Sequence, residues 1–180
     1  MKIQIVYASL TGCTRRVASA IYNQLPTQEK SIHNLVDGIP VLDGDIILFG
    51  YWGTGGAPCQ EMQSLLRSVK DKAVGIFCTL GYYADSAHAR ETLESGIHLV
   101  KDRNQVIGGY VCNGAVARNL QEAQGLGGEH IPTQQKELRW EMTAGHPTKA
   151  ECDLAAERFR ERITLYCRCR ELGIPFQSIL

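Results

Sequence analysis

Short apolar runs alternate with segments of helical spacing along the first hundred residues of the chain. The runs Ile3–Ala8, Asp45–Gly50 and Ala73–Cys78 are apolar at most positions, which is typical of strands buried on both faces of a sheet. Ser31–Val36 is a weaker strand candidate, and Gln105–Val111 is a further one. The pattern therefore predicts five strands.

Amphipathic helices are expected between these strands. Thr14–Leu25 carries Val17 and Ile21 on one stripe, and Gln60–Val69 and Ser86–Val100 repeat this one-sided spacing. Buried strands that alternate with such helices are typical of an α/β fold, in which a doubly wound parallel sheet is covered by helices on both faces. Its crossover connections should be right-handed.

Residues 112–147 do not continue this alternation. Short helices are expected near Val116–Gln124 and Thr133–Met142, with a glycine-rich stretch between them that suits a helix interior poorly. The spacing of Thr148 and Glu151 then forms a capping box, which opens a last helix. We therefore expect an irregular insertion around 112–147.

Length, charge balance and the length of the apolar runs exclude several classes of protein. A chain of 180 residues fits one domain over residues 1–180. Nineteen basic and nineteen acidic residues cancel, which argues against a nucleic-acid binder held by a positive field. The apolar runs are far too short to cross a bilayer, and the start of the chain lacks the apolar run of a signal peptide. We therefore expect a cytoplasmic protein that binds neither nucleic acid nor membrane.

The seven cysteines and five histidines show no metal-binding spacing. No Cys-x-x-Cys pair occurs, so no metal site is predicted. Scattered cysteines favour reduced, packed thiols over a disulfide framework. Cys13 and Cys59 lie near candidate loops, where packing is favoured over a redox role. No nucleophile–base–acid motif is present.

The segment Ser9-Leu10-Thr11-Gly12-Cys13-Thr14 joins the first strand to the first helix. Backbone N–H groups at a helix N-terminus suit a phosphate, and Ser and Thr hydroxyls add donors without adding charge. The segment matches neither the Walker loop nor the dinucleotide fingerprint. A helix N-terminus that is simply rich in Ser and Thr is the alternative interpretation.

Two further strand ends combine glycines with aromatic residues. Gly50–Pro58 contains Tyr51 and Trp52, and Thr79–Ala84 contains Tyr82 and Tyr83. Glycine lets the backbone approach a flat ligand closely, and aromatic rings can stack on it. Ligands of open parallel sheets bind beyond the carboxyl ends of the strands, where these segments are expected to meet.

These three segments together resemble those of the flavodoxin family, over roughly residues 1–112. The resemblance implies a flavodoxin-like sheet of five strands in the order 2-1-3-4-5 and FMN as the cofactor. It implies that residues 9–14 bind the FMN phosphate and that Trp52 and either Tyr82 or Tyr83 flank the isoalloxazine. The implied cofactor-binding residues are Ser9, Leu10, Thr11, Gly12, Cys13, Thr14, Tyr51, Trp52, Gly53, Thr54, Gly55, Thr79, Leu80, Gly81, Tyr82 and Tyr83.

The chain departs from typical flavodoxins in its charge. Those proteins are strongly acidic, whereas residues 9–14, 50–58 and 79–84 contain no charged side chain. Carboxylates near an anionic reduced flavin lower its reduction potential through like-charge repulsion. We therefore expect a less negative potential for formation of fully reduced FMN than in an acid-rich flavodoxin.

The resemblance implies an electron carrier that exchanges electrons transiently with redox partner proteins, a reductase and an acceptor enzyme. The final third also resembles small bacterial flavodoxin-like proteins that accompany tetrapyrrole (bilirubin) reductases. An NAD(P)H-dependent FMN oxidoreductase acting on quinones or other small acceptors is the alternative, and a non-redox phosphate-binding module is a third hypothesis. Residues 112–147 would dock a partner, cover the flavin or build a nicotinamide pocket.

Overall fold

The computed structural model describes residues 1–117 and 134–178. Five parallel strands form the sheet in the order β2-β1-β3-β5-β6, and the short strand β4 pairs antiparallel with the end of β3. Numbered along the chain without β4, this is the predicted order 2-1-3-4-5. The strands are β1 (Ile3–Tyr7), β2 (Lys30–Asn34), β3 (Ile46–Thr54), β4 (Ala57–Pro58), β5 (Ala73–Leu80) and β6 (Gln105–Asn113).

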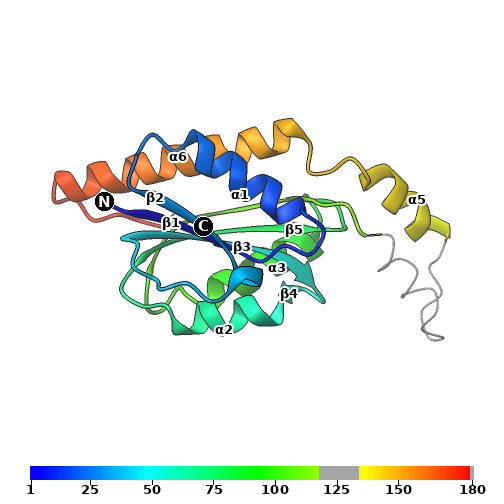
Figure 1. The fold of residues 1–180 in the computed structure, drawn as a ribbon, viewed down its shortest axis with the longest axis horizontal. Helices are drawn as coiled ribbons and strands as arrows, with labels where there is room; N and C mark the ends of the chain where they lie inside the picture. The colour runs from blue at the N-terminus through cyan, green and yellow to red at the C-terminus, as the bar shows by residue number, and fades with distance from the viewer. Residues whose placement is uncertain (118–133, 179–180) are drawn as a thin grey trace.

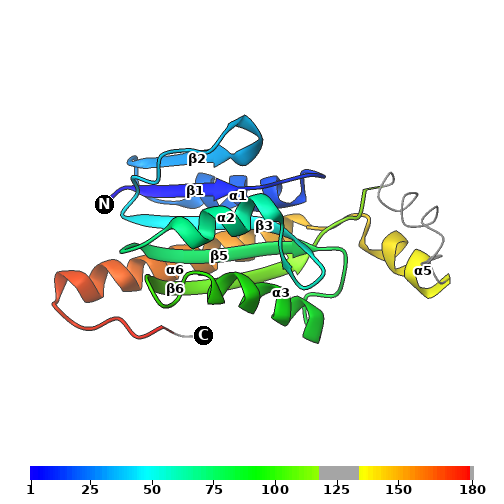
Figure 2. The ribbon, with the colours of Figure 1, turned by 90° about the horizontal axis from the view of Figure 1, so that it is seen from below.

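Helices cover both faces of the sheet, which confirms the doubly wound α/β fold. Helices α1 and α6 lie on one face, and α2 and α3 lie on the other (Figures 1 and 2). Helix α5 lies apart from both layers, beyond the carboxyl ends of the strands. The helices are α1 (Cys13–Gln24), the 3-10 turn η1 (Leu35–Asp37), α2 (Gln60–Ser68), α3 (Ala87–His98), α5 (Gln134–Thr143) and α6 (Lys149–Glu171).

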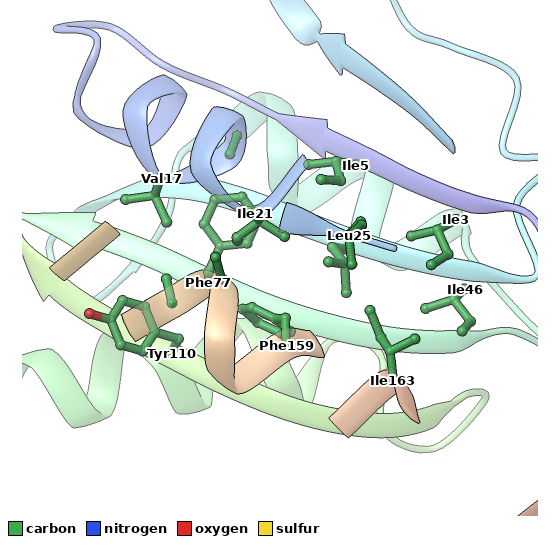
Figure 3. Packing of buried hydrophobic residues seen from close by; sticks show 14 of the residues in the cluster. Ile3, Ile5, Val17, Ile21, Leu25, Ile46, Phe77, Tyr110, Phe159 and Ile163 are labelled. Carbon is green, nitrogen blue, oxygen red and sulfur yellow. The ribbon is translucent and has the colours of Figure 1, made fainter. Parts of the chain in front are cut away.

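One core cluster fills the space between the sheet and the pair α1 and α6 (Figure 3). Ile21 of α1 and Phe159 of α6 are fully buried there. The Phe159 ring stands edge-on to Phe77, with 6.1 Å between the ring centroids. It also lies against Gly75, where a Cβ atom would come within 2.6 Å of the ring. Glycine at this position therefore lets α6 approach the sheet closely.

A second core cluster lies under α2 and α3. Met62 and Leu66, which the helical spacing places on one stripe of α2, are fully buried against the sheet. Phe49 and Ile76 meet them from neighbouring strands. The strands are therefore buried on both faces, as their continuous apolar runs predicted.

The segment Gly50–Pro58 forms a β-hairpin, whereas the sequence predicted that the strand ends at Gly50. Strand β3 continues to Thr54, and its end pairs with β4 across a two-residue turn. Gly55 and Gly56 form this turn with φ values of 56° and 77°. Two successive positive φ angles produce a hairpin turn that matches the twist of the strands, and glycine adopts them without strain. The glycine pair thus allows the sheet to extend beyond Gly50.

The irregular insertion is described in part. Helix α5 closely matches the predicted helix Thr133–Met142. The other predicted helix, Val116–Gln124, lies outside the described residues from position 118 onward. The predicted capping box at the start of α6 is confirmed, with its two reciprocal hydrogen bonds. In the part of the chain that the structure describes, no helix has the length and apolar content needed to span a membrane.

Candidate functional site

A cavity of about 430 Å³ lies at the carboxyl ends of β1, β3 and β5. Three strand-end segments and helix α5 form its walls, as does the backbone that follows β6. Its described lining residues are Leu10, Thr11, Cys13, Trp52, Gly53, Thr54, Gly55, Thr79, Leu80, Gly81, Tyr82, His88, Gly114, Ala115, Val116, Lys136, Arg139 and Trp140. The three segments that the sequence singled out therefore meet at one edge of the sheet.

The first segment turns sharply from β1 into α1. Gly12 stands at the N-cap position with φ 87°, and the first turn of α1 contains no acidic residue. Glycine offers no capping side chain, although Ser9 Oγ accepts a hydrogen bond from Arg15 N at 3.2 Å. N–H groups at the start of a helix lack intrahelical partners. This helix end is therefore suited to an anion.

A buried hydrogen bond joins the first segment to the end of β5. The hydroxyls of Thr14 and Thr79 lie 3.0 Å apart, and both residues are almost fully buried. Thr79 lines the cavity, whereas Thr14 does not. The Thr14 hydroxyl thus fixes two cavity segments relative to each other.

The hairpin of β3 and β4 presents one aromatic residue to the cavity and buries its neighbour. Trp52 lines the cavity and is half-buried. Tyr51 lies in β3 with no solvent exposure, and its hydroxyl donates to the Thr92 carbonyl at 2.8 Å. Burial raises the pKa of the Tyr51 phenol well above its usual value. Because successive side chains of a strand point to opposite faces, only one of these neighbours reaches the cavity.

The third segment contributes Tyr82. Its ring is edge-on to Tyr83 and to His88, with centroid separations of 5.8 Å and 5.7 Å. The guanidinium carbon of Arg139 lies 4.2 Å from the centroid of the same ring. Tyr83 is 43% exposed and does not line the cavity. Tyr82 is therefore the aromatic residue of this segment that the cavity wall contains.

Helix α5 forms a further wall of the cavity, and its lining residues were not among the predicted site residues. Lys136, Arg139 and Trp140 stand at spacings of three and four residues, which place them on one helical face. Trp140 is 6% exposed, and the Lys136 ammonium lies 5.1 Å from the centroid of its ring. Residues 112–147 were predicted to dock a partner, to cover the flavin or to build a nicotinamide pocket, and the α5 residues among them line the cavity.

The carbonyl of His146, shortly before α6, connects this part of the chain to α1. The His146 carbonyl accepts hydrogen bonds from Arg16 Nη2 at 2.7 Å and from Ala115 N at 3.0 Å. The Cys13 thiol lies 3.6 Å from the same oxygen and 3.7 Å from the Ala115 carbonyl. Cys13 is almost fully buried by these contacts. Packing thus accounts for this cysteine, although it lines the cavity.

Two further buried cysteines, Cys59 and Cys78, are poor candidates for thiol chemistry. Burial raises the pKa of Cys59 to about 11, and it raises that of Cys78 to about 12. The thiolate is the reactive form of cysteine, so both groups are protonated and unreactive at neutral pH. All seven cysteines of the chain are free.

Among the described lining residues of the cavity, the side chains with a permanent charge are cationic. The lining residues that the structure describes include Lys136 and Arg139 but no aspartate or glutamate. The strand-end segments add hydroxyl and backbone groups only. An anionic or partly anionic ligand therefore meets no like charge among these residues.

Most of the predicted site residues line the cavity, and a smaller group does not. Those that do not line the cavity lie beside it or in the core: Ser9, Gly12, Thr14, Tyr51 and Tyr83. The lining residues that were not predicted are His88, Gly114, Ala115, Val116 and the α5 residues Lys136, Arg139 and Trp140. The helical spacing at Lys136, Arg139 and Trp140 was available in the sequence, but nothing in it tied that face to the strand ends.

Known proteins resemble the chain over most of its length. A family model described as a flavodoxin domain matches residues 4–160. A relative in Clostridioides difficile (strain CD3), the flavodoxin-like domain-containing protein BilS, is 27% identical over 158 residues, which cover 84% of this chain and 90% of that protein.

Two solved structures have the same fold at low sequence identity. Oxidised flavodoxin 2 from Bacillus cereus has a TM-score of 0.55 at 18% identity, with 90% of this chain and 99% of that one covered. The flavodoxin WrbA-like protein from Agrobacterium tumefaciens has a TM-score of 0.55 at 19% identity, with coverage of 93% and 97%. At these identities the two structures show the fold alone.

Proposed function

The chain belongs to the flavodoxin domain family, and on this premise we propose that it binds FMN in the cavity and carries electrons to a partner oxidoreductase. One observation carries the proposal. Three strand-end segments without a charged side chain, around Thr11, Trp52 and Tyr82, line the same cavity. A flat, singly phosphorylated ring system needs an anion site and stacking surfaces close together, and these segments offer both.

The phosphate is assigned to residues 9–14. Gly12 offers the start of α1 without a capping side chain, and no acidic residue lies in its first turn. The Thr11 hydroxyl lies at the cavity wall. A phosphate would receive donors from the backbone and from hydroxyls, and the helix dipole favours its negative charge. The residues present thus fit this part of FMN.

The isoalloxazine is assigned to the space lined by Trp52 and Tyr82. These side chains come from the ends of neighbouring strands, and large aromatic rings supply apolar area and stacking faces. The backbone of Gly53–Gly55 lines the same space and offers peptide groups to the polar edge of a ring. When bound, FMN supplies the redox chemistry, and the protein binds, orients and tunes it.

The partner that we propose is an acceptor oxidoreductase, with a tetrapyrrole reductase as the candidate class. The resemblance of the final third of the sequence supports this class. A carrier of this kind would also receive electrons from a reductase. We propose that it works in the cytoplasm, in agreement with seven free cysteines.

An NAD(P)H-dependent FMN oxidoreductase acting on quinones or other small acceptors is the second candidate. The observation that favours it is the α5 wall, where Lys136 and Arg139 bring positive charge and Trp140 brings a flat apolar surface. Such a wall suits an anionic, aromatic second substrate.

The test is a reductive titration of the purified protein, followed by absorption. We expect the protein to bind one FMN and to show flavin absorption bands that bleach stepwise. In a second measurement, the reduced protein is mixed with a tetrapyrrole reductase and its substrate. With oxygen excluded, a carrier should be reoxidised only when both are present, and it should not consume NADPH with a quinone by itself.

Two results would contradict these assignments. Failure of the folded protein to bind FMN, measured by equilibrium dialysis, would end the redox proposal. Steady oxidation of NADPH by the isolated protein in the presence of a quinone would favour the oxidoreductase over the carrier.

A further inference from the structure

Arg139 brings a positive charge to the cavity from outside the strand-end segments. It lies on α5, lines the cavity and is half-buried. Its guanidinium carbon lies 4.2 Å from the centroid of the Tyr82 ring, within the range of a cation–π contact. The Nε atom is buried and has no hydrogen-bond partner among the described residues. The side chain is therefore held against an aromatic residue.

No aspartate or glutamate among the described lining residues offsets this charge. A charge in a partly buried pocket acts on its neighbours through a lower effective dielectric constant than a charge on an open surface. A ligand beside Arg139 is therefore exposed to the positive field of its guanidinium.

We propose that Arg139 tunes the reduction potential of bound FMN by favouring its anionic reduced form. This inference rests on the proposed FMN binding. Two electrons from a reductase and one proton from solvent convert the neutral isoalloxazine into a ring with one negative charge. Arg139 attracts that charge but has little effect on the neutral oxidised ring. It acts through its electrostatic field, its contact with Tyr82 holds it in place, and it transfers neither electrons nor protons itself.

The ratio of the dissociation constants of reduced and oxidised FMN is linked to the reduction potential of the bound FMN. If Arg139 binds the reduced form more tightly than the oxidised form, thermodynamic linkage raises the potential by the same free energy. For a two-electron couple, a tenfold change in the ratio of the two dissociation constants equals about 30 mV. The affinity ratio and the potential must therefore change together.

The experiment compares Arg139→Gln with Arg139→Lys. We expect Arg139→Gln to weaken the binding of reduced FMN relative to oxidised FMN about three- to tenfold, which lowers the potential by roughly 15–30 mV. Arg139→Lys keeps the charge and should retain most of the wild-type potential. Potentials are measured by titration against a reference dye, and dissociation constants by anaerobic titration of each redox form.

Two variants control for net charge. Glu141 lies on the same helix but outside the cavity lining, and Glu141→Gln removes its negative charge. Arg160→Gln removes a positive charge from the exposed surface of α6. Both should leave the potential near that of the wild type, because exposed charges are screened. Far-ultraviolet circular dichroism of each variant checks that its helices are formed.

The outcomes separate this inference from the proposed function. If wild-type protein binds no FMN, the proposed function itself fails. If it binds FMN and Arg139→Gln has the wild-type potential, only the role of Arg139 is overturned. An equal fall in potential in Arg139→Lys would also overturn it, because the geometry of the side chain would then be responsible. An equal fall in either control would overturn it as well, because net charge would then be responsible.

Discussion

The cavity has two kinds of wall, and they are built from different parts of the chain. The strand-end wall, around Thr11, Trp52 and Tyr82, is free of charged side chains and continues directly from the buried sheet. The α5 wall, at Lys136, Arg139 and Trp140, includes two cationic residues and belongs to a helix outside the βα alternation. The strand-end wall provides hydroxyl, backbone and aromatic groups, and the α5 wall provides positive charge.

The difference lies in how each wall is held. The strand ends are fixed by ladder pairing and by the core, as the buried hydrogen bond between Thr14 and Thr79 illustrates. Helix α5 contacts this wall through Arg139 and Tyr82, and the segment after it is anchored at the His146 carbonyl. We therefore expect changes in the strand-end wall to alter folding or affinity, and changes in α5 mainly to alter the potential.

Phe159→Ala should have the largest effect, because it removes the ring that packs on Gly75 beneath the sheet. Loss of a buried phenylalanine typically costs about 3–5 kcal/mol. Urea unfolding followed by circular dichroism should show this loss of unfolding free energy. Leu154→Ala, on the same helix but 41% exposed, is the control and should cost far less. Equal losses would mean that α6 does not stabilise the sheet through this contact.

Trp52→Ala should weaken FMN binding about 10- to 100-fold, because it removes a stacking surface from the strand-end wall. Flavin fluorescence quenching during titration measures the dissociation constant. Trp52→Phe keeps an aromatic ring and should recover much of the affinity. Unchanged binding by Trp52→Ala would contradict the assignment of the ring to this side of the cavity.

Tyr51→Phe distinguishes a core residue from its neighbour at the site. The change removes the buried hydrogen bond to the Thr92 carbonyl and should cost about 1 kcal/mol of stability. It should leave the FMN dissociation constant unchanged, because Tyr51 does not line the cavity. Thermal unfolding and the same fluorescence titration measure both effects. Weaker FMN binding by Tyr51→Phe at unchanged stability would contradict the placement of Tyr51 in the core and not at the cavity.

Thr148→Ala should have a smaller effect, of about 0.5–1 kcal/mol, because it removes the N-cap of α6. The Thr148 hydroxyl accepts from Glu151 N at 3.2 Å, and Glu151 Oε2 accepts from Thr148 N at 2.6 Å. Thr148→Ser keeps the cap and serves as the matched control in thermal unfolding. Equal stability of the two variants would exclude a contribution of the cap.

The capping box should also make stability depend on pH. Burial opposes ionisation of Glu151, but hydrogen bonds from Thr148 and His146 outweigh it and hold the pKa of this carboxyl below its usual value. A lowered pKa stabilises the fold above the ordinary value of about 4.5 and loses this effect as pH falls through the lowered value. Glu151→Gln should therefore differ most from the wild type above pH 5, and a difference that grew on acidification would contradict this.

Much of this protein could be predicted from the order of its residues. Continuous apolar runs such as Ala73–Cys78 identify strands buried on two faces, because a one-sided strand would alternate with polar residues. The spacing of Thr148 and Glu151 identified the start of α6, since capping depends on residues three positions apart. Such local patterns also marked the segments that line the cavity.

Only the tertiary structure decided which side chains reach that cavity. Tyr51 and Trp52 are adjacent aromatic residues beside glycines, but extension of β3 by the hairpin sends one into the core and the other to the cavity. Likewise, no local pattern joins Arg139 to Tyr82, which lies more than fifty positions earlier in the chain. Secondary structure follows from interactions between near neighbours, whereas the charge of the cavity wall depends on where packing brings a distant helix.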